Sequence, residues 1–466
     1  MEAERVLRRT NVLLRRLGRT LSALINRATL YRFTDDALLL SSALAGIVVG
    51  LAIVVFHKVL ELFELGWRML SPEAWQATGI DHLSWTTLLV PLSTAAGGFV
   101  VGLLKRSVLF RDVHHRGLHS VSESLSEKAS PLTWKHSLHA MILSSVSIAS
   151  GGGAGREAPT VILGSSVASG LARLGQLDRR HIRVLGAAGA AAAISGIFNA
   201  PLGGILFSVE AITGELRART FLPIVIASVL ATTTVRTILG NDPLLVAPLE
   251  HGVSLIDYPL LAIAGICSAF IAAYYLRTYR STFKRTAVGL QSIPELARPA
   301  LGGLLAGLPL MVLPWLLETT YRPINMALSG SMNPTWWVGI LLATATIILK
   351  PITNAVTLAS GGEGGTLAPA MKVGALFGFV FGTLLSLVLP ETSVGLYAIV
   401  CAGAVLSGSF RAPLTGGLLL FEVSGNYELL LPLLFSAVVS VYIIRRLGVA
   451  TFNPLDDLDT QVSRSQ

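Results

Sequence analysis

Stretches of about 20 predominantly apolar residues recur along this chain, and no other feature constrains its fold as strongly. The clearest of them occupy residues 37–56, 86–104, 221–240, 258–276 and 431–448. A helix of about 20 apolar residues is long enough to cross the hydrocarbon core of a bilayer. Only 14% of the 466 residues are charged, whereas soluble domains carry roughly 25%. The sequence therefore predicts an all-α, polytopic membrane protein, and it lacks the short alternating segments of an outer-membrane barrel.

The net charge of +9 is explained by basic residues that flank the predicted spans, as the positive-inside rule requires. Residues 1–36 interleave arginines with leucines, which is typical of an amphipathic segment at a cytoplasmic membrane surface. Arg445 and Arg446 lie near the end of the last span, so the positive-inside rule places both termini in the cytoplasm. No signal peptide or regulatory domain is recognised, which favours a prokaryotic inner-membrane protein. The transmembrane domain is expected at 37–448, followed by a polar tail at 449–466, and no motif indicates a nucleic acid as a partner.

The chain also contains an internal repeat. ASGGGAGREAP (149–159) matches ASGGEGGTLAP (359–369) at seven of eleven positions after a shift of 210 residues. GIFNAPLGGILFSVE (196–210) matches GSFRAPLTGGLLLFE (408–422) at eight of fifteen positions after a shift of 212. Two blocks in the same order at nearly the same offset indicate two related halves. These halves cover about 37–240 and 258–448.

Both halves place a glycine cluster and a proline turn before short apolar runs. Interrupted apolar helices in matching positions of two halves indicate a binding site near the middle of the membrane. Helix N-termini present N–H groups and a positive dipole end, which suit an anion. The adjacent Arg156 and Glu157 lie in the first cluster, at a depth where a charged residue is costly and is by default a functional candidate. The pattern favours a small anion over a cation.

These motifs resemble the signature of the CLC family of chloride channels and chloride/proton exchangers. Gly155-Arg156-Glu157-Ala158-Pro159 resembles the family's G-R-E-G-P motif, and Gly365-Thr366-Leu367-Ala368-Pro369 resembles G-x-F-x-P with Leu367 in place of Phe. Phe198-Asn199-Ala200-Pro201-Leu202 and Asn426-Tyr427 also match. The resemblance extends from about residue 37 to 445. It implies two inverted halves of tilted, broken helices and a homodimer with one anion path in each subunit, and it implies no cofactor.

The resemblance implies that Glu157 is the gating glutamate. Its carboxylate would compete with chloride for the outermost site and would leave when protonated, whereas the alternative role is a structural pair with Arg156. Gly155 lets the backbone approach the ion, and Arg156 is interpreted as bracing the loop.

The resemblance also assigns the central anion. The backbone N–H groups of Thr366 and Leu367, after Gly365, would bind it, and the Tyr427 hydroxyl would complete the site from the inner side. A tyrosine at such a place can instead be an interfacial anchor.

The family's inner G-S-G-x-P motif is the poorest match. Arg116 stands where the anion-coordinating serine is expected, and only Gly117 is retained. Either Ser120 or Ser122 coordinates the anion instead of the missing serine, or the cationic Arg116 lies at the inner entrance. The nearby histidines are expected to be exposed loop residues, so no metal site is predicted; they are His114, His115 and His119.

A second departure concerns proton coupling. Coupled members of the family often carry a glutamate directly after the one that matches Glu210, but here the next residue is Ala211, which cannot relay a proton. Glu210 and its repeat counterpart Glu422 are interpreted as structural residues that cap helix ends. This favours a voltage-gated or pH-gated chloride channel, and the alternative is a chloride/proton antiporter with another relay. An intramembrane serine hydrolase is a remote alternative, because no histidine or aspartate in the apolar runs could activate a serine, and no enzyme is expected.

Overall fold

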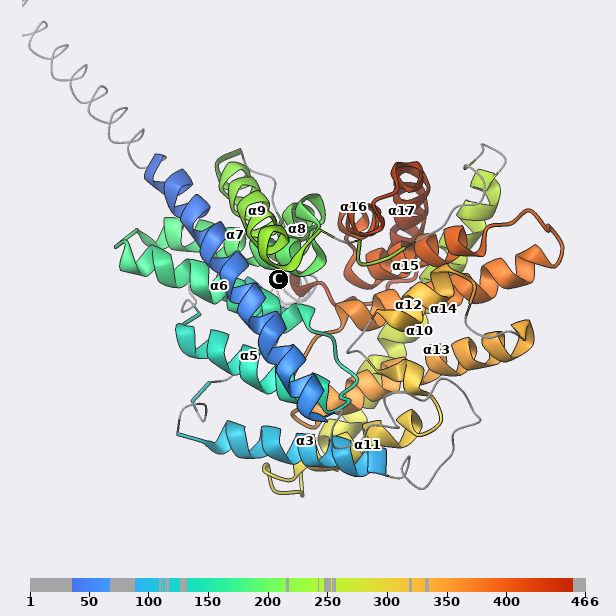
Figure 1. Cartoon of the computed structure of the whole chain (residues 1–466), viewed down its shortest axis with the longest axis horizontal. Coiled ribbons are helices and arrows are strands. Elements are labelled where there is room, and N and C mark those ends of the chain that lie inside the picture. The colour runs from blue at the N-terminus through green and yellow to red at the C-terminus, as the bar shows by residue number, and fades with distance from the viewer. Residues whose placement is uncertain are drawn as a thin grey trace, which may run out of the picture.

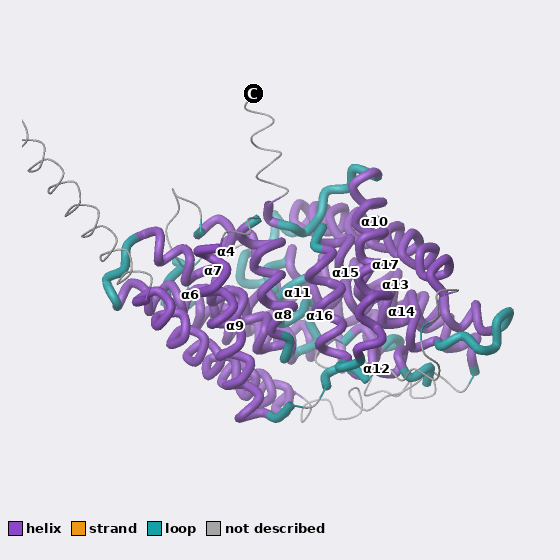
Figure 2. Tube along the Cα trace, turned by 90° about the horizontal axis from the view of Figure 1, so that it is seen from above, coloured by secondary structure: helices purple, strands orange, loops and turns teal. Residues whose placement is uncertain are grey.

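The structure, a computed structural model, is built almost entirely of helices (Figures 1 and 2). It describes residues 36–67, 89–108, 110, 112–113, 117–125, 132–214, 218–241, 243–246, 253, 257–317, 321–331 and 335–455. The first half comprises a helix at Asp36–Trp67, α3 (Leu89–Arg106), α4 (Leu118–Ser124), α5 (Trp134–Ala149), α6 (Glu157–Leu174), α7 (Arg179–Phe198), α8 (Pro201–Phe207), the π-helix η3 (Ser208–Thr213) and α9 (Ala218–Leu239). The second half comprises α10 (Tyr258–Gly289), α11 (Arg298–Leu310), η5 (Pro314–Leu316), α12 (Arg322–Leu328), α13 (Trp336–Ala359), α14 (Leu367–Ser386), α15 (Val394–Phe410), α16 (Pro413–Ser424), η6 (Tyr427–Leu429) and α17 (Leu430–Arg446).

Seven helices in the described part of the chain are long and apolar enough to cross a membrane. They include segments that the sequence predicts as spans, such as 37–56, 221–240 and 258–276. The shorter helices α8, α15 and α16 are also apolar. The prediction of an all-α polytopic protein with broken helices is therefore confirmed. The expected amphipathic segment at 1–36 lies outside the described residues except for its last residue.

The internal repeat is visible in the backbone. Helices α7 and α15 both end on a residue in the left-handed conformation, Asn199 (φ 57°) and Arg411 (φ 50°), 212 positions apart. Such a φ is uncommon for residues other than glycine. Gly151 (φ 101°) and Gly361 (φ 100°), 210 positions apart, form a second matched pair. The two halves thus repeat their turns as well as their helices, because the same sequence blocks impose the same local geometry.

Close helix pairs surround the middle of the molecule. Helix α6 packs along α7 in the first half, and α14 packs along α15 in the second. Glycines make this approach possible: a Cβ at Gly164 would overlap the Gly189 carbonyl, and a Cβ at Gly378 would overlap the Tyr397 carbonyl. Small residues are the usual means by which membrane helices approach closely.

The packed body continues beyond the expected boundary at residue 448. The Phe452 N–H donates to the Ser409 carbonyl over 2.8 Å, and Arg280 donates to the Thr451 carbonyl over 2.7 Å. Thr451 and Asn453 are buried. The expected polar tail at 449–466 therefore begins with a packed segment, and residues 456–466 lie outside the described part.

Candidate anion site between the two repeats

The two glycine loops of the repeat meet in the interior. Gly155 and Gly365 exchange both backbone hydrogen bonds, with N···O distances of 2.9 and 2.6 Å. Helix α6 begins two residues after Gly155, and α14 begins two residues after Gly365. The N-termini of two helices from different halves are therefore brought together. Thr366 is the N-cap of α14 and Leu367, 2% exposed, is its first residue. Helix N-termini carry a partial positive charge and unpaired N–H groups, so their meeting point suits an anion.

The Glu157 carboxylate lies at this meeting point. It is 1% exposed, and one of its oxygens accepts a hydrogen bond from the Ala368 N–H in the first turn of α14, over 3.3 Å. Gly155 provides the space, because a Cβ there would overlap the same carboxylate oxygen. A Cβ at the counterpart Gly365 would instead lie 3.0 Å from the backbone nitrogen and the Cβ of Ala158. The carboxylate of one repeat thus occupies the helix N-terminus of the other.

Asn354 braces the loops, and sequence reasoning did not single it out. Its side-chain nitrogen donates to the Gly153 carbonyl (3.0 Å) and the Gly365 carbonyl (3.1 Å), one in each repeat. Its oxygen accepts the Tyr275 hydroxyl over 3.2 Å. The sequence does contain a signal for Asn354, because it is a polar amide within a long apolar segment. Polar residues at membrane depth are by default functional candidates.

Arg156 lies beside the site and packs its guanidinium over the ring of Tyr321, 5.0 Å from the ring centroid. A guanidinium over an aromatic face gains energy from the ring quadrupole. The backbone carbonyl of Arg156 accepts the Thr160 hydroxyl over 2.7 Å. These contacts hold the start of α6 against the segment between η5 and α12.

Glu210 and Glu422 cap helices across the repeats. The Glu210 carboxylate accepts the N–H groups of Leu414 (3.2 Å) and Thr415 (2.7 Å) and the Thr415 hydroxyl (2.7 Å), at the start of α16. Glu422, on α16, accepts the Gly203 N–H over 2.8 Å at the start of α8. The hydrogen bonds are of the kind expected for helix-capping residues. Each repeat satisfies the helix end of the other, which is the reciprocity that an approximate two-fold axis produces.

The inner residues of the predicted site are described in part. Arg116 lies outside the described residues. Gly117, with φ at 60°, precedes α4, and Ser120 lies within that helix, half-buried. Ser122 donates to the Ile212 carbonyl of η3 over 3.3 Å, so α4 packs against the π-helix. Ala211, in that π-helix, is fully buried.

The structure does not bring Tyr427 to the site, contrary to the expectation from the sequence. Tyr427 is 77% exposed at the start of η6 and packs its ring on Phe421, with centroids 6.0 Å apart. It follows the end of α16 and precedes α17, whereas the two loops meet at the starts of α6 and α14. Its motif thus marks a turn between helices.

Two buried lysines were also missed by sequence reasoning. Lys350 on α13 and Lys372 on α14 are fully buried. Lys350 donates to the Leu316 carbonyl over 2.6 Å, and Lys372 donates to the carbonyls of Trp315 and Leu317. Two ammonium groups thus hold three consecutive carbonyls at and after η5.

Comparisons with known proteins agree with this architecture. Residues 97–445 match the family model described as voltage gated chloride channel. The chain is 28% identical over 407 residues to a ClcB-like chloride channel protein of Ralstonia nicotianae, covering 85% of this chain and 91% of the relative. It is 27% identical over 438 residues to the H(+)/Cl(-) exchange transporter ClcA of Vibrio vulnificus, covering 90% of this chain and 88% of the relative.

A solved structure of a slow cyanobacterial Cl-/H+ antiporter superposes with a TM-score of 0.77 at 21% identity, over 92% of this chain and 99% of that one. This likeness concerns the fold. The family match, in contrast, covers most of the chain. The chain therefore belongs to the CLC family of anion-transporting membrane proteins.

Proposed function

We propose that this protein exchanges chloride for protons across the membrane through the site where the two repeats meet. The observation that carries the proposal is the position of Glu157, whose buried carboxylate accepts a hydrogen bond from the Ala368 N–H at the start of α14. A carboxylate and a chloride ion have the same charge, and both favour a helix N-terminus. The two therefore compete for one position.

Protonation decides that competition. An ionised Glu157 is held by the N–H groups and the positive end of α14, and it blocks the path of the anion. A neutral carboxyl group interacts less with that dipole, so it leaves and an anion takes its place. Because each cycle that displaces the carboxylate binds a proton, Glu157 links anion movement to proton movement on its side of the site.

The alternative is passive conduction, and one observation favours it. Ala211, in η3, has no titratable group. The neighbouring carboxylate, Glu210, accepts hydrogen bonds from the N–H and the hydroxyl of Thr415 at the start of α16. Sequence reasoning preferred a channel for this reason. A curated relative that covers most of the chain is named an H(+)/Cl(-) exchange transporter, which supports exchange. The inner relay would then involve another residue.

The test is transport by the purified protein in liposomes. External pH and chloride are recorded while valinomycin clamps the voltage, with a chloride gradient as the driving force. Exchange predicts uphill proton movement that follows the chloride gradient. Glu157→Gln should abolish this proton movement and leave chloride flux insensitive to pH. Absence of proton movement in the wild-type protein, with robust chloride flux, would establish the channel reading instead.

The proposal includes the setting of the protein. We place it in a prokaryotic inner membrane with both termini in the cytoplasm, because arginines dominate the first 36 residues and Arg445 and Arg446 end α17. We propose a homodimer, as the family resemblance implies, in which each subunit has its own site at the starts of its α6 and α14. Chemical crosslinking in native membranes tests the dimer.

A further inference from the structure

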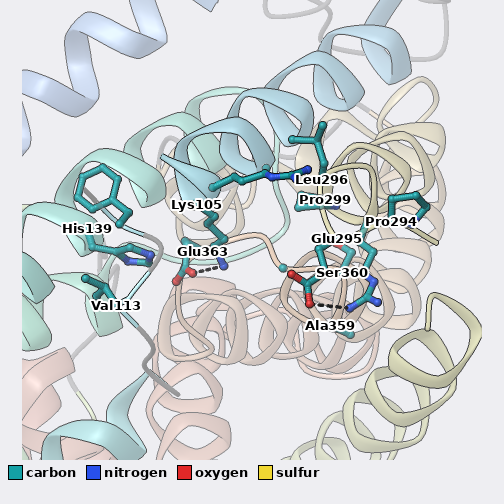
Figure 3. Close-up of a pocket in the computed structure, with 15 residues that line it drawn as sticks. Lys105, Val113, His139, Pro294, Glu295, Leu296, Pro299, Ala359, Ser360 and Glu363 are labelled. Carbon is teal, nitrogen blue, oxygen red and sulfur yellow. Dashed lines mark ion pairs between the residues drawn. The ribbon is translucent and has the colours of Figure 1, made fainter. Parts of the chain in front are cut away.

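A cavity lies apart from the site already described, between α3, α5, α11 and the loop that joins α13 to α14 (Figure 3). Its volume is about 680 Å³. Its titratable and charged lining residues are Lys105, Arg106, His139, Glu295, Arg298 and Glu363. Neither the gate nor the helix caps involve this cavity.

Glu363 is the less exposed of the two carboxylates of this cavity. Its side chain is 12% exposed and pairs with Lys105, with 2.5 Å between the ammonium nitrogen and the carboxylate oxygen. Figure 3 shows the two side chains facing each other. The other carboxylate, Glu295, is 91% exposed and lies 3.9 Å from Arg298. Glu363 is therefore the acidic group that is both within the protein and in contact with the cavity.

Glu363 is also close to the gate along the chain. It precedes Gly365 by two residues, so their Cα atoms lie at most about 7 Å apart. The hydrogen-bonded pair of Gly365 and Gly155 adds about 5.5 Å, and the Glu157 carboxylate lies against Gly155. The Cα of Glu363 is thus within about 16 Å of the Glu157 carboxylate.

Buried hydroxyl groups contact the two glycine loops that carry these carboxylates. The Glu363 N–H donates to the hydroxyl of Ser147 on α5 over 3.2 Å. Ser147 and Thr357 are buried, and the Thr357 hydroxyl accepts the Gly153 N–H over 3.0 Å. Hydroxyl groups both donate and accept hydrogen bonds, so they suit a path for protons.

The cavity lies at the end of the molecule where basic residues gather. Lys105 and Arg106 end α3, and Arg298 begins α11. Arg280 and Arg285 lie in the last part of α10, which leads directly to α11. By the positive-inside rule this end faces the cytoplasm. Glu363 thus faces the side from which a proton must enter the inner half of the path.

We propose that Glu363 is the internal proton acceptor of this transporter. The inference rests on the proposed chloride/proton exchange and names the relay that Ala211 does not provide. A hydronium ion in the cavity gives its proton to the Glu363 carboxylate and becomes water. The carboxyl group passes the proton along water and hydroxyl groups to Glu157, and Glu363 returns to its ionised form beside Lys105. No electron moves, and each cycle carries one proton inward or outward.

The test is Glu363→Gln in proteoliposomes, with chloride and proton fluxes recorded in the same sample. We expect chloride flux to persist while proton flux falls by a factor of about 100, the usual contribution of a positioned acid or base. Glu363→Asp retains the carboxyl group and should recover part of the proton flux. Glu295→Gln changes the exposed carboxylate of the same cavity and should leave both fluxes at the wild-type level.

Four results are informative. Selective loss of proton flux in Glu363→Gln, with recovery in Glu363→Asp, supports the proposal. Unchanged proton flux in Glu363→Gln would overturn it while leaving exchange intact. A parallel fall of both fluxes at a constant ratio would also overturn it, because the pair of Glu363 and Lys105 would then be structural. If the wild-type protein moves no protons, the proposed exchange fails first and the relay fails with it.

Discussion

Gly155→Ala is the sharpest perturbation of the gate that the structure offers. A methyl group at this position would overlap the Glu157 carboxylate oxygen that accepts the Ala368 N–H. The end of a glutamate side chain is flexible, so the carboxylate moves and its hydrogen bond is lost. A hydrogen bond to a charged group contributes about 2 kcal/mol. The occupancy of the blocking position, relative to the displaced one, should therefore fall by a factor of about 30.

The anion loses this position as well. The methyl group lies where the anion must bind when the carboxylate leaves, because the two compete for the same place. We therefore expect Gly155→Ala to bind chloride or bromide about 30-fold more weakly than the wild-type protein, measured by titration calorimetry in detergent. Chloride flux in liposomes should also lose its dependence on pH, because the carboxylate no longer blocks the path.

Gly365→Ala is the matched control. It adds the same methyl group to the partner glycine of the same backbone pair, but its neighbours are the Cβ and nitrogen of Ala158, each 3.0 Å away, and not the carboxylate. Anion affinity should therefore stay near the wild-type value or decline slightly through strain. Equal anion affinities for the two variants would refute the idea that Glu157 and the anion share one position at this helix end.

Two further predictions concern stability. Glu210→Ala leaves two N–H groups at the start of α16 without their acceptor and should lower the free energy of unfolding by about 2–4 kcal/mol. Glu210→Gln retains one acceptor oxygen and should lower it less. Thermal unfolding in detergent measures both variants, with Glu422→Ala as the counterpart in the other repeat, and equal losses of stability for Glu210→Ala and Glu210→Gln would contradict capping. Lys372→Met keeps most of the length of the side chain but removes the donor to the carbonyls of Trp315 and Leu317. It should lower the free energy of unfolding by about 1–3 kcal/mol. An unchanged unfolding temperature would show that these contacts contribute nothing to stability.

The sequence contained enough information to predict the repeat and its turns, because each depends on local chemistry. The left-handed residues Asn199 and Arg411 lie within matching blocks, and the glycine loops recur at an offset of 210 residues. The charged pair at Arg156 and Glu157 was recognisable because charge at membrane depth is rare.

Residues that act over long distances could not be placed in the same way. The pairing of Glu363 with Lys105 joins residues 258 positions apart on different elements, and nothing local to either residue indicates the other. The prediction for Tyr427 was wrong for a different reason. Its motif coincides with a turn between α16 and α17, but the motif does not specify which groups that turn faces. Asn354 was missed because an amide in an apolar helix has no spacing that points to its partners.

The hydrogen bonds exchanged by Gly155 and Gly365 have a consequence for the ancestry of the chain. Neither repeat forms a complete site alone, because the start of α14 in the second repeat binds the Glu157 carboxylate of the first. A primitive chain with a single repeat would have gained an anion site only by pairing with a second copy in the opposite orientation. Such a chain would have to insert into the membrane in both orientations. Two halves within one chain can instead differ in charge, as they do here, where Glu157 in the first repeat has Leu367 as its counterpart in the second.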